Sequence, residues 1–360
     1  MKFQRLKIEG FRGISKLDIK ELSQINLFIG KNNCGKTALL EAIFLNIGCS
    51  NPELILKIDL FRNIFHNQRD DFRFIFRNLD YANKLKIVGY LINPSQDREL
   101  VIEPSKSKRQ REEISTIKSD ELANASSSDY SIMKDVDLLK FNFKISSEKQ
   151  VQTFSSEILF RDNKSVFKID SRYKEVLNGS FLNKRSIFLQ LYEKIDQLLI
   201  NKQVKPIITI LKKMEPSIES ISLGANNMVY MEVGLERLVP LNIMGDGVVH
   251  LVSILTHIAT AREGIILIDE MENGLHFASL ELLWRGIFEA SQLYNVQLFI
   301  TTHSYECVEA LVKISQENLF EKDQYNIHVY RLEKKPEEID YQMFDQDSVG
   351  HFIDKNWELR

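Results

Sequence analysis

Residues 28–43 read FIGKNNCGKTALLEAI, and this stretch constrains the fold more than any other part of the chain. An apolar strand runs into a turn bracketed by Gly30 and Gly35, and a helical pattern starts at Lys36. The octet over residues 30–37 fits G-x-x-x-x-G-K-[ST], in which backbone N–H groups and a helix N-terminus surround bound phosphates. The sequence therefore predicts a P-loop after a buried strand.

Every position of this octet is expected to bind nucleotide. Lys36 should reach the β- and γ-phosphates and act in catalysis, and Thr37 should place its hydroxyl on Mg²⁺. A glycine-rich turn that fits the pattern by chance is the alternative, which the flanking strand and helix disfavour. Cys34 is either a thiol whose alkylation blocks nucleotide binding or a small inert loop residue. The predicted nucleotide-binding residues of the loop are Gly30, Lys31, Asn32, Asn33, Cys34, Gly35, Lys36 and Thr37.

A second apolar run, within GIILIDEMENGLH over residues 264–276, ends in two adjacent carboxylates. In a P-loop protein the first of them, Asp269, is expected to hold Mg²⁺ through water or Thr37. The second, Glu270, is expected to orient or deprotonate the attacking water, because phosphoryl transfer depends on positioning and charge neutralisation. An ordinary strand with a polar end is the alternative, and the P-loop earlier in the chain disfavours it.

A third buried strand, in VQLFITTHS, ends at His303. A histidine at the carboxyl end of a strand next to the Asp-Glu strand points into the ligand crevice of an open α/β sheet. We therefore expect His303 to act in catalysis, at the γ-phosphate or the attacking water. The other histidines have no such placement and are interpreted as structural.

These segments, in this order, resemble ATP-binding-cassette (ABC)-type ATPases of the SMC, RecF and OLD branch. The resemblance rests on RLKIEGFRG, GKNNCGKT, IDEMENGLH and TTHS, and it covers roughly residues 1–50 and 240–305. It implies an α/β fold with the mixed sheet of an ABC/SMC-type P-loop NTPase core, ATP and Mg²⁺ as cofactors, and hydrolysis of ATP to ADP and phosphate. Standalone OLD-like ATPases of this kind are placed in bacterial anti-phage or abortive-infection systems.

The resemblance also implies a homodimer, or a higher homo-oligomer, with ATP sandwiched between two chains. The segment NIMGDGVVHLVSIL occupies the place of the cassette signature, where Gly245, Asp246 and Gly247 open a helix and would meet the γ-phosphate held by the opposing subunit. The usual Leu-Ser-Gly-Gly-Gln is absent, and Asp246 adds a negative charge at this helix start.

Other positions carried over from the resemblance have two readings. Arg12 either contacts the nucleotide or is a solvated arginine at a turn. Asn273 and His276 either report across the dimer interface or, for Asn273 with Gly274, cap a local turn. No residue stands out for the glutamine loop, so its Mg²⁺ contact is unassigned.

The order of the motifs predicts one nucleotide domain split by an insertion. We divide the chain into an N-terminal half of the ATPase core over residues 1–103, an inserted α+β subdomain over 104–216, and a C-terminal half of the core over 217–360. Within the insertion, residues 104–131 are rich in Ser, Lys, Arg and Glu and predict a mobile loop, and residues 184–214 predict a helical pair.

Periodicity predicts the elements around these motifs. Strands are expected over residues 2–9, 14–20, 84–92, 98–103, 137–146, 151–160, 164–169, 218–233, 265–268 and 296–301, with a hairpin at 325–344. Helices are expected over residues 36–47, 246–261, 277–291 and 304–314.

Composition narrows the class of protein. No apolar run approaches the ~20 residues that span a bilayer, and the start of the chain lacks a signal-peptide core, so we expect no membrane partner. Three cysteines without metal-ligand spacing suit a reducing cytoplasm. A net charge of −3 offers no global basic field, although nucleic acid stays open as a partner.

Two functions remain after these steps. The first is an ATP-dependent dimerisation switch or sensor in anti-phage defence that controls a separately encoded effector, because the stretch after His303 is too short for the nuclease domain of full-length OLD proteins. The second is a RecF-like DNA repair or recombination ATPase. The long heptad arm of SMC proteins is absent from residues 104–216. The altered signature disfavours a transporter subunit, and Glu270 disfavours a protein that binds ATP without turnover.

Overall fold

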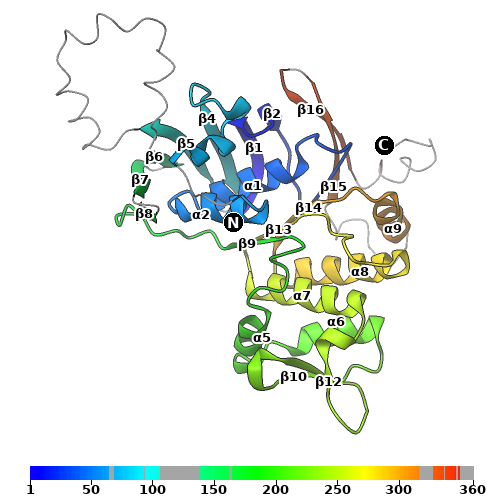
Figure 1. Cartoon of the computed structure of the whole chain (residues 1–360). Coiled ribbons are helices and arrows are strands. Elements are labelled where there is room, and N and C mark those ends of the chain that lie inside the picture. The colour runs from blue at the N-terminus through cyan, green and yellow to red at the C-terminus, as the bar shows by residue number, and fades with distance from the viewer. Residues whose placement is uncertain are drawn as a thin grey trace, which may run out of the picture.

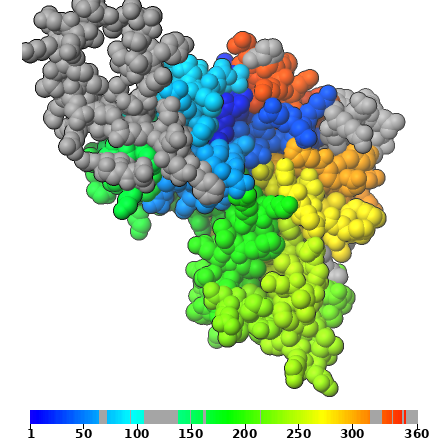
Figure 2. Space-filling view, in the orientation of Figure 1, coloured from blue at the N-terminus to red at the C-terminus, as the bar shows by residue number. Residues whose placement is uncertain are grey.

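The computed structural model describes residues 1–64, 69–92, 94–105, 138–148, 150–161, 164–315, 327–335, 337–345 and 348. This part of the chain forms two lobes (Figures 1 and 2). The upper lobe holds two large sheets, and the lower lobe holds helices and a small sheet. None of the helices described combines the length and apolar character needed to cross a membrane.

A six-stranded sheet forms the centre of the protein, in the order β16-β15-β3-β14-β13-β9. All neighbours are parallel except β15 and β16, which are antiparallel. Every residue of β3, β13 and β14 is buried, which explains why these strands are mostly apolar on both faces. The strands are β3 (Ile25–Ile29), β9 (Gly179–Leu182), β13 (Ile265–Ile268), β14 (Gln297–Thr301), β15 (Ile327–Lys334) and β16 (Ile339–Phe344).

Helix α1 (Lys36–Ile47) connects the central sheet to the rest of the upper lobe. It packs against β9, β13 and β14 on one side and against β1, β4 and β5 of the second sheet on the other. α1 starts and ends where the sequence predicts, and α2 (Glu53–Phe61) follows it. Because β3, β13 and β14 are parallel, the segments that follow them meet at one edge of the sheet, at the start of α1.

The second sheet has seven antiparallel strands in the order β2-β1-β4-β5-β6-β7-β8. Inner and outer residues alternate in burial along β5 and β6, as one-sided packing requires. The strands are β1 (Lys2–Phe11), β2 (Ile14–Ile19), β4 (Leu85–Ile92), β5 (Gln96–Ser105), β6 (Leu138–Ser147), β7 (Val151–Arg161) and β8 (Lys164–Lys168). Two short 3-10 helices, η1 (Arg69–Ile75) and η2 (Arg77–Leu79), precede β4.

This topology bears on the predicted insertion. The expected boundary between residues 103 and 104 falls within β5, and β6–β8 continue the sheet that starts with β1 and β2. The strands were predicted, but their pairing with β5 was not, because alternation shows which face of a strand is buried and not which strand lies beside it. The predicted mobile loop lies outside the described residues from position 106 onward. The division of the chain into three parts stays a prediction.

The lower lobe contains four helices around a shared apolar core. α6 has proline in its first turn, where the missing N–H costs no helical hydrogen bond. The helices of the lower lobe are α5 (Leu191–Ile200), α6 (Lys205–Met214), α7 (Asp246–Thr260) and α8 (Phe277–Leu293). Helix α9 (Tyr305–Ser315) packs on α8. The small sheet is β10 (Ser220–Leu223), β11 (Val229–Glu232) and β12 (Val239–Pro240), with 3-10 helices η4 (Ala225–Asn227) and η5 (Leu241–Ile243).

A buried arginine holds the carboxyl end of α1. Arg98 of β5 is fully buried, and its Nε donates to the carbonyl oxygen of Asn46 at 3.2 Å. Its Nη2 donates to the carbonyl oxygen of Ile47 at 3.0 Å and to Glu175 Oε2 at 2.7 Å. Arg98 therefore joins the last turn of the P-loop helix to the segment that leads into β9.

Replacing Arg98 should destabilise the fold. Arg98→Met removes the arginine donor from two helix-end carbonyl groups and from the Glu175 carboxylate, which loses its ion pair, so we expect the free energy of unfolding to fall by about 3 kcal/mol. Urea denaturation measures this change. The control is Arg172→Met, which removes an exposed arginine paired with Asp170 and should change little. Equal stability of both variants would contradict the importance of the Arg98 contacts.

Candidate nucleotide-binding and hydrolysis site

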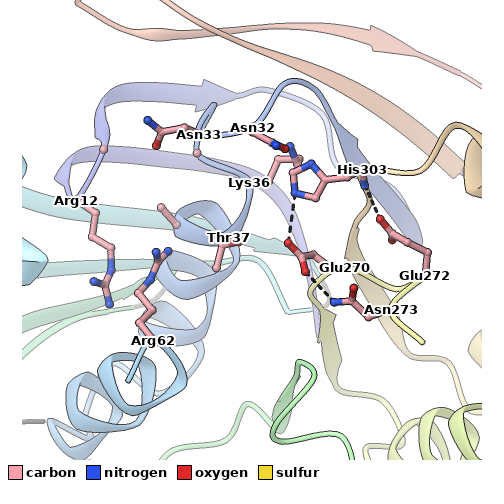
Figure 3. A pocket seen from close by; sticks show the side chains of 13 residues that line it. Arg12, Asn32, Asn33, Lys36, Thr37, Arg62, Glu270, Glu272, Asn273 and His303 are labelled. Atoms are coloured by element: carbon pink, nitrogen blue, oxygen red, sulfur yellow. Dashed lines mark hydrogen bonds and ion pairs between the residues drawn. The ribbon is translucent and has the colours of Figure 1, made fainter. Parts of the chain in front are cut away.

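A cavity of about 620 Å³ lies at the start of α1, where the carboxyl ends of the parallel strands meet. Figure 3 shows Arg12, Arg62 and Thr37 on one side of it, with Glu270, His303, Glu272 and Asn273 on the other. Segments distant in sequence therefore line a single cavity. Its lining residues are Arg12, Gly13, Asn32, Asn33, Gly35, Lys36, Thr37, Ala38, Arg62, Glu270, Glu272, Asn273 and His303.

The P-loop needs glycine at both ends. Gly30 has φ 141° and Gly35 has φ 104°, and both values favour a residue without Cβ. A Cβ on Gly30 would lie 2.5 Å from the carbonyl oxygen of Leu332, and one on Gly35 would lie 2.7 Å from Ile339 Cδ1. The loop is thus shaped by the hairpin of β15 and β16 packed behind it.

Lys36 lies inside the curve of the loop and is almost fully buried. Its Nζ donates to the carbonyl oxygens of Gly30 at 2.6 Å and Lys31 at 3.0 Å. Burial lowers the pKa of Lys36, because desolvation disfavours the charged form. The buried Cys34 Sγ lies 3.7 Å from Nζ, which leaves both readings of this thiol open.

Asp269 and Thr37 meet beneath the cavity. The Thr37 hydroxyl donates to both carboxylate oxygens of Asp269 at 3.1 Å, and the Thr301 hydroxyl donates to Oδ1 at 2.7 Å. Burial raises the pKa of Asp269. A hydroxyl and a carboxylate beside a phosphate loop are oxygen donors of the kind Mg²⁺ takes, with substrate phosphates and water as its remaining ligands. When bound there, Mg²⁺ would neutralise phosphate charge.

Glu270 has a left-handed backbone with φ 53°, an uncommon conformation for a residue other than glycine. Its N–H donates to Thr301 Oγ1 at 2.8 Å, so one hydroxyl contacts both Asp269 and Glu270. The Glu270 carboxylate accepts from Asn273 Nδ2 at 2.7 Å and lies 3.4 Å from His303 Nε2. This carboxylate can accept a proton or orient a water in the cavity.

The loop around His303 is held by a residue that sequence reasoning missed. Glu272 accepts from the backbone N–H of His303 at 2.7 Å and lines the cavity. His276 has a structural contact, since its Nδ1 accepts from the N–H of Ala278 at the start of α8.

Arg12 lines the cavity but is engaged by the protein. Its Nε lies 2.7 Å from Glu41 Oε2, and its Nη2 donates to Asp59 Oδ1 at 2.6 Å. The solvated reading of Arg12 is wrong, because only 9% of its side chain is exposed. Nucleotide contact by Arg12 stays a prediction.

Gly245, Asp246 and Gly247 do not line the cavity. Gly245 precedes α7 with φ 87°, and a Cβ placed on it would meet nothing within 4 Å. Two exposed apolar side chains lie near this region. Ile243, just before it in the sequence, is 72% exposed, and Phe277, at the start of α8, is 66% exposed. Phe277 belongs here because its helix, α8, packs against α7, and a Cβ on Gly247 would lie 3.0 Å from Ser279 Oγ.

Asn183 occupies the strand end next to Asp269. It follows β9, and the N–H of Asp269 donates to the carbonyl oxygen of Leu182 at 2.8 Å. Asn183 Oδ1 accepts from the N–H groups of Arg185 and Ser186 at 2.9 Å, so it closes a local turn. No sequence pattern marks this position, since β9 is short and its partner strand is far away in the chain.

Comparison with known proteins identifies the family. Residues 25–309 match the family described as "AAA domain, putative AbiEii toxin, Type IV TA system". The match spans more than three quarters of the chain, and the protein belongs to this family of P-loop ATPases. The protein is an ATPase with an α/β P-loop NTPase fold, as the sequence predicts.

Two curated relatives and one solved structure are similar to the chain. An ATP/GTP phosphatase of Helicobacter pylori is 26% identical over 347 residues, which cover 88% of this chain and 89% of the relative. The DNA replication and repair protein RecF of Shewanella pealeana is 34% identical over 110 residues, 30% of this chain and 29% of RecF. The SMC head bound to the C-winged-helix domain of ScpA has a TM-score of 0.50 and 11% identity, covers 96% of this chain and 98% of that chain, and shows the fold alone.

The shared hydroxyl of Thr301 should matter for hydrolysis more than for binding. Thr301→Val keeps the shape of the side chain but removes the contacts to Asp269 and to the Glu270 N–H. We expect kcat to fall about 10- to 100-fold, the range typical of residues that orient metal ligands. Steady-state phosphate release measures kcat, and a nucleotide titration measures the binding affinity. An unchanged kcat would show that neither carboxylate depends on Thr301.

Proposed function

We propose that the protein is an ATP-dependent dimerisation switch in which two chains enclose ATP and hydrolysis separates them. One observation carries this proposal. The cavity is lined by the P-loop, Glu270 and His303, with Asp269 beneath it, whereas residues 245–247 lie outside it. The family resemblance gives those three residues a contact to the γ-phosphate, and a second copy of the chain would supply it.

The surface around residues 245–247 supports a partner there. Ile243 and Phe277 are the most exposed large apolar side chains near the start of α7. Apolar side chains beside a helix N-terminus suit an interface in which the helix end meets a phosphate and the side chains pack on protein. In this dimer the proposed roles are phosphate binding for Lys36, Mg²⁺ binding for Thr37 and Asp269, and water positioning for Glu270 with His303.

We further propose that the switch acts in anti-phage defence through a separate effector in the cytoplasm. The family description names a toxin of a toxin–antitoxin system, which supports a function exerted together with a second polypeptide. No residue of the chain identifies that effector.

A RecF-like role is the second candidate, favoured by the 34% identity to RecF over 110 residues. A protein with this role would bind DNA duplex with an affinity that falls steeply with salt and depends on ATP. Absence of ATP-dependent duplex binding, together with ATP-dependent dimers, would favour the switch.

Two variants test the proposed switch. Lys36→Ala should lose ATP binding, because it removes the cation enclosed by the P-loop. Glu270→Gln should still bind ATP, hydrolyse it at least about 100-fold more slowly, and accumulate dimers. Light scattering after size-exclusion chromatography with ATP and Mg²⁺ measures the dimers. Turnover at the wild-type rate in Glu270→Gln would rule out its assigned role.

A double variant provides the control for the interface. Glu270→Gln combined with Ile243→Asp places a charge on the proposed contact surface and should remain monomeric with ATP. Nucleotide affinity of the monomer should be unchanged, because Ile243 does not line the cavity. Dimers formed equally well by the double variant would show that this surface is not the interface.

A further inference from the structure

Two arginines share one wall of the cavity, and their surroundings differ. Arg12 is held from several sides, by Glu41 at 2.7 Å, by Asp59 at 2.6 Å and by the carbonyl oxygen of Phe74 at 3.5 Å. With 9% of its side chain exposed, it is part of the protein interior. Moving Arg12 toward a ligand would leave two buried carboxylates without a major partner, which is costly.

Arg62 follows directly after α2 and is bound along one edge only. Its Nε lies 2.6 Å from Glu41 Oε1, and its Nη2 donates to Glu41 Oε2 at 3.1 Å. Its side chain is 36% exposed and lines the cavity beside Thr37 (Figure 3). Within the described residues Glu41 is its only ion-pair partner.

Glu41 permits Arg62 to change partner. The Glu41 carboxylate is fully buried, and burial raises its pKa. It is paired with Arg12 and Arg62 on different oxygens, so it keeps one cationic partner, Arg12, when Arg62 turns away. The exchange therefore costs much less than removing the single partner of a buried charge.

The position of Arg62 indicates which part of a nucleotide it would meet. Its charge interacts with that of Asp269, the carboxylate that contacts Thr37. Thr37 and Asp269 are the residues that would hold Mg²⁺ against the phosphates, so the neighbouring space suits the end of the phosphate chain. A guanidinium binds phosphate oxygens through two parallel hydrogen bonds, as it binds a carboxylate.

We propose that Arg62 binds the terminal phosphate of ATP and exchanges Glu41 for it when the nucleotide enters. The inference rests on the proposed nucleotide site and adds a phosphate-sensing cation to it. Sequence reasoning missed Arg62, because nothing in LFRN around it distinguishes a cavity residue from a solvated one.

Binding of a triphosphate analogue and a diphosphate tests this inference. Fluorescence titrations with mant-labelled AMP-PNP and ADP, in Mg²⁺, give both dissociation constants for the full chain. Arg62→Ala should weaken AMP-PNP about 10- to 100-fold, as expected for a charge-assisted contact, and ADP less than about threefold. The AMP-PNP affinity of Arg62→Lys should fall between those of wild type and Arg62→Ala, because lysine keeps the charge but cannot make the two parallel hydrogen bonds of a guanidinium.

Three controls separate the outcomes. Lys57→Ala removes an exposed cation from α2, the helix that ends just before Arg62, and should leave both affinities unchanged. Arg12→Ala should lower the melting temperature much more than Arg62→Ala does, because Glu41 keeps Arg12 in the second variant. Lys36→Ala should lose both nucleotides, and its failure to do so would overturn the nucleotide site itself. Equal weakening of AMP-PNP and ADP by Arg62→Ala, no weakening, or a melting temperature as low as that of Arg12→Ala would each overturn the proposal for Arg62.

Discussion

The site depends on the contact between the Thr37 hydroxyl and the Asp269 carboxylate, which lie 3.1 Å apart and 232 positions apart in the chain. It requires β3 and β13 to end at the same edge of one sheet, with only β14 between them. Three buried apolar strands provide that arrangement, and α1 is fixed over it by two sheets. A change that shifted one strand by a residue would turn these polar groups away from each other.

The same edge concentrates features that cost stability. Glu270 has a left-handed backbone, and burial shifts the pKa values of Lys36 and Asp269 toward their neutral forms. The hydroxyl of Thr301 partly offsets these costs, because it binds Asp269 and the Glu270 N–H at once. Strain and shifted pKa values in one cavity are typical of a site selected for chemistry instead of stability.

Most strands and helices of the core could be predicted from sequence because their signals are local, but the short strand β9 of the central sheet was not predicted. Apolar runs define β3, β13 and β14, and the glycine-bracketed turn defines the start of α1. Contacts between distant polar residues could not be predicted. Glu41 and Asp59 look like ordinary helical carboxylates, yet burial makes them the partners of Arg12 and Arg62. Likewise, Thr301 and Glu272 stood in recognised motifs, but only the fold shows which atoms they reach.

The affinity of the nucleotide-bound protein for Mn²⁺, used in place of Mg²⁺ and measured by EPR, tests the central claim most directly. If Thr37 and Asp269 converge on one metal–nucleotide complex, Thr37→Val and Asp269→Asn should each weaken Mn²⁺ binding in the presence of AMP-PNP by about tenfold or more. Both variants should weaken it far less without nucleotide, since phosphate oxygens complete the metal site. Unchanged Mn²⁺ affinity in both variants with AMP-PNP bound would contradict the account.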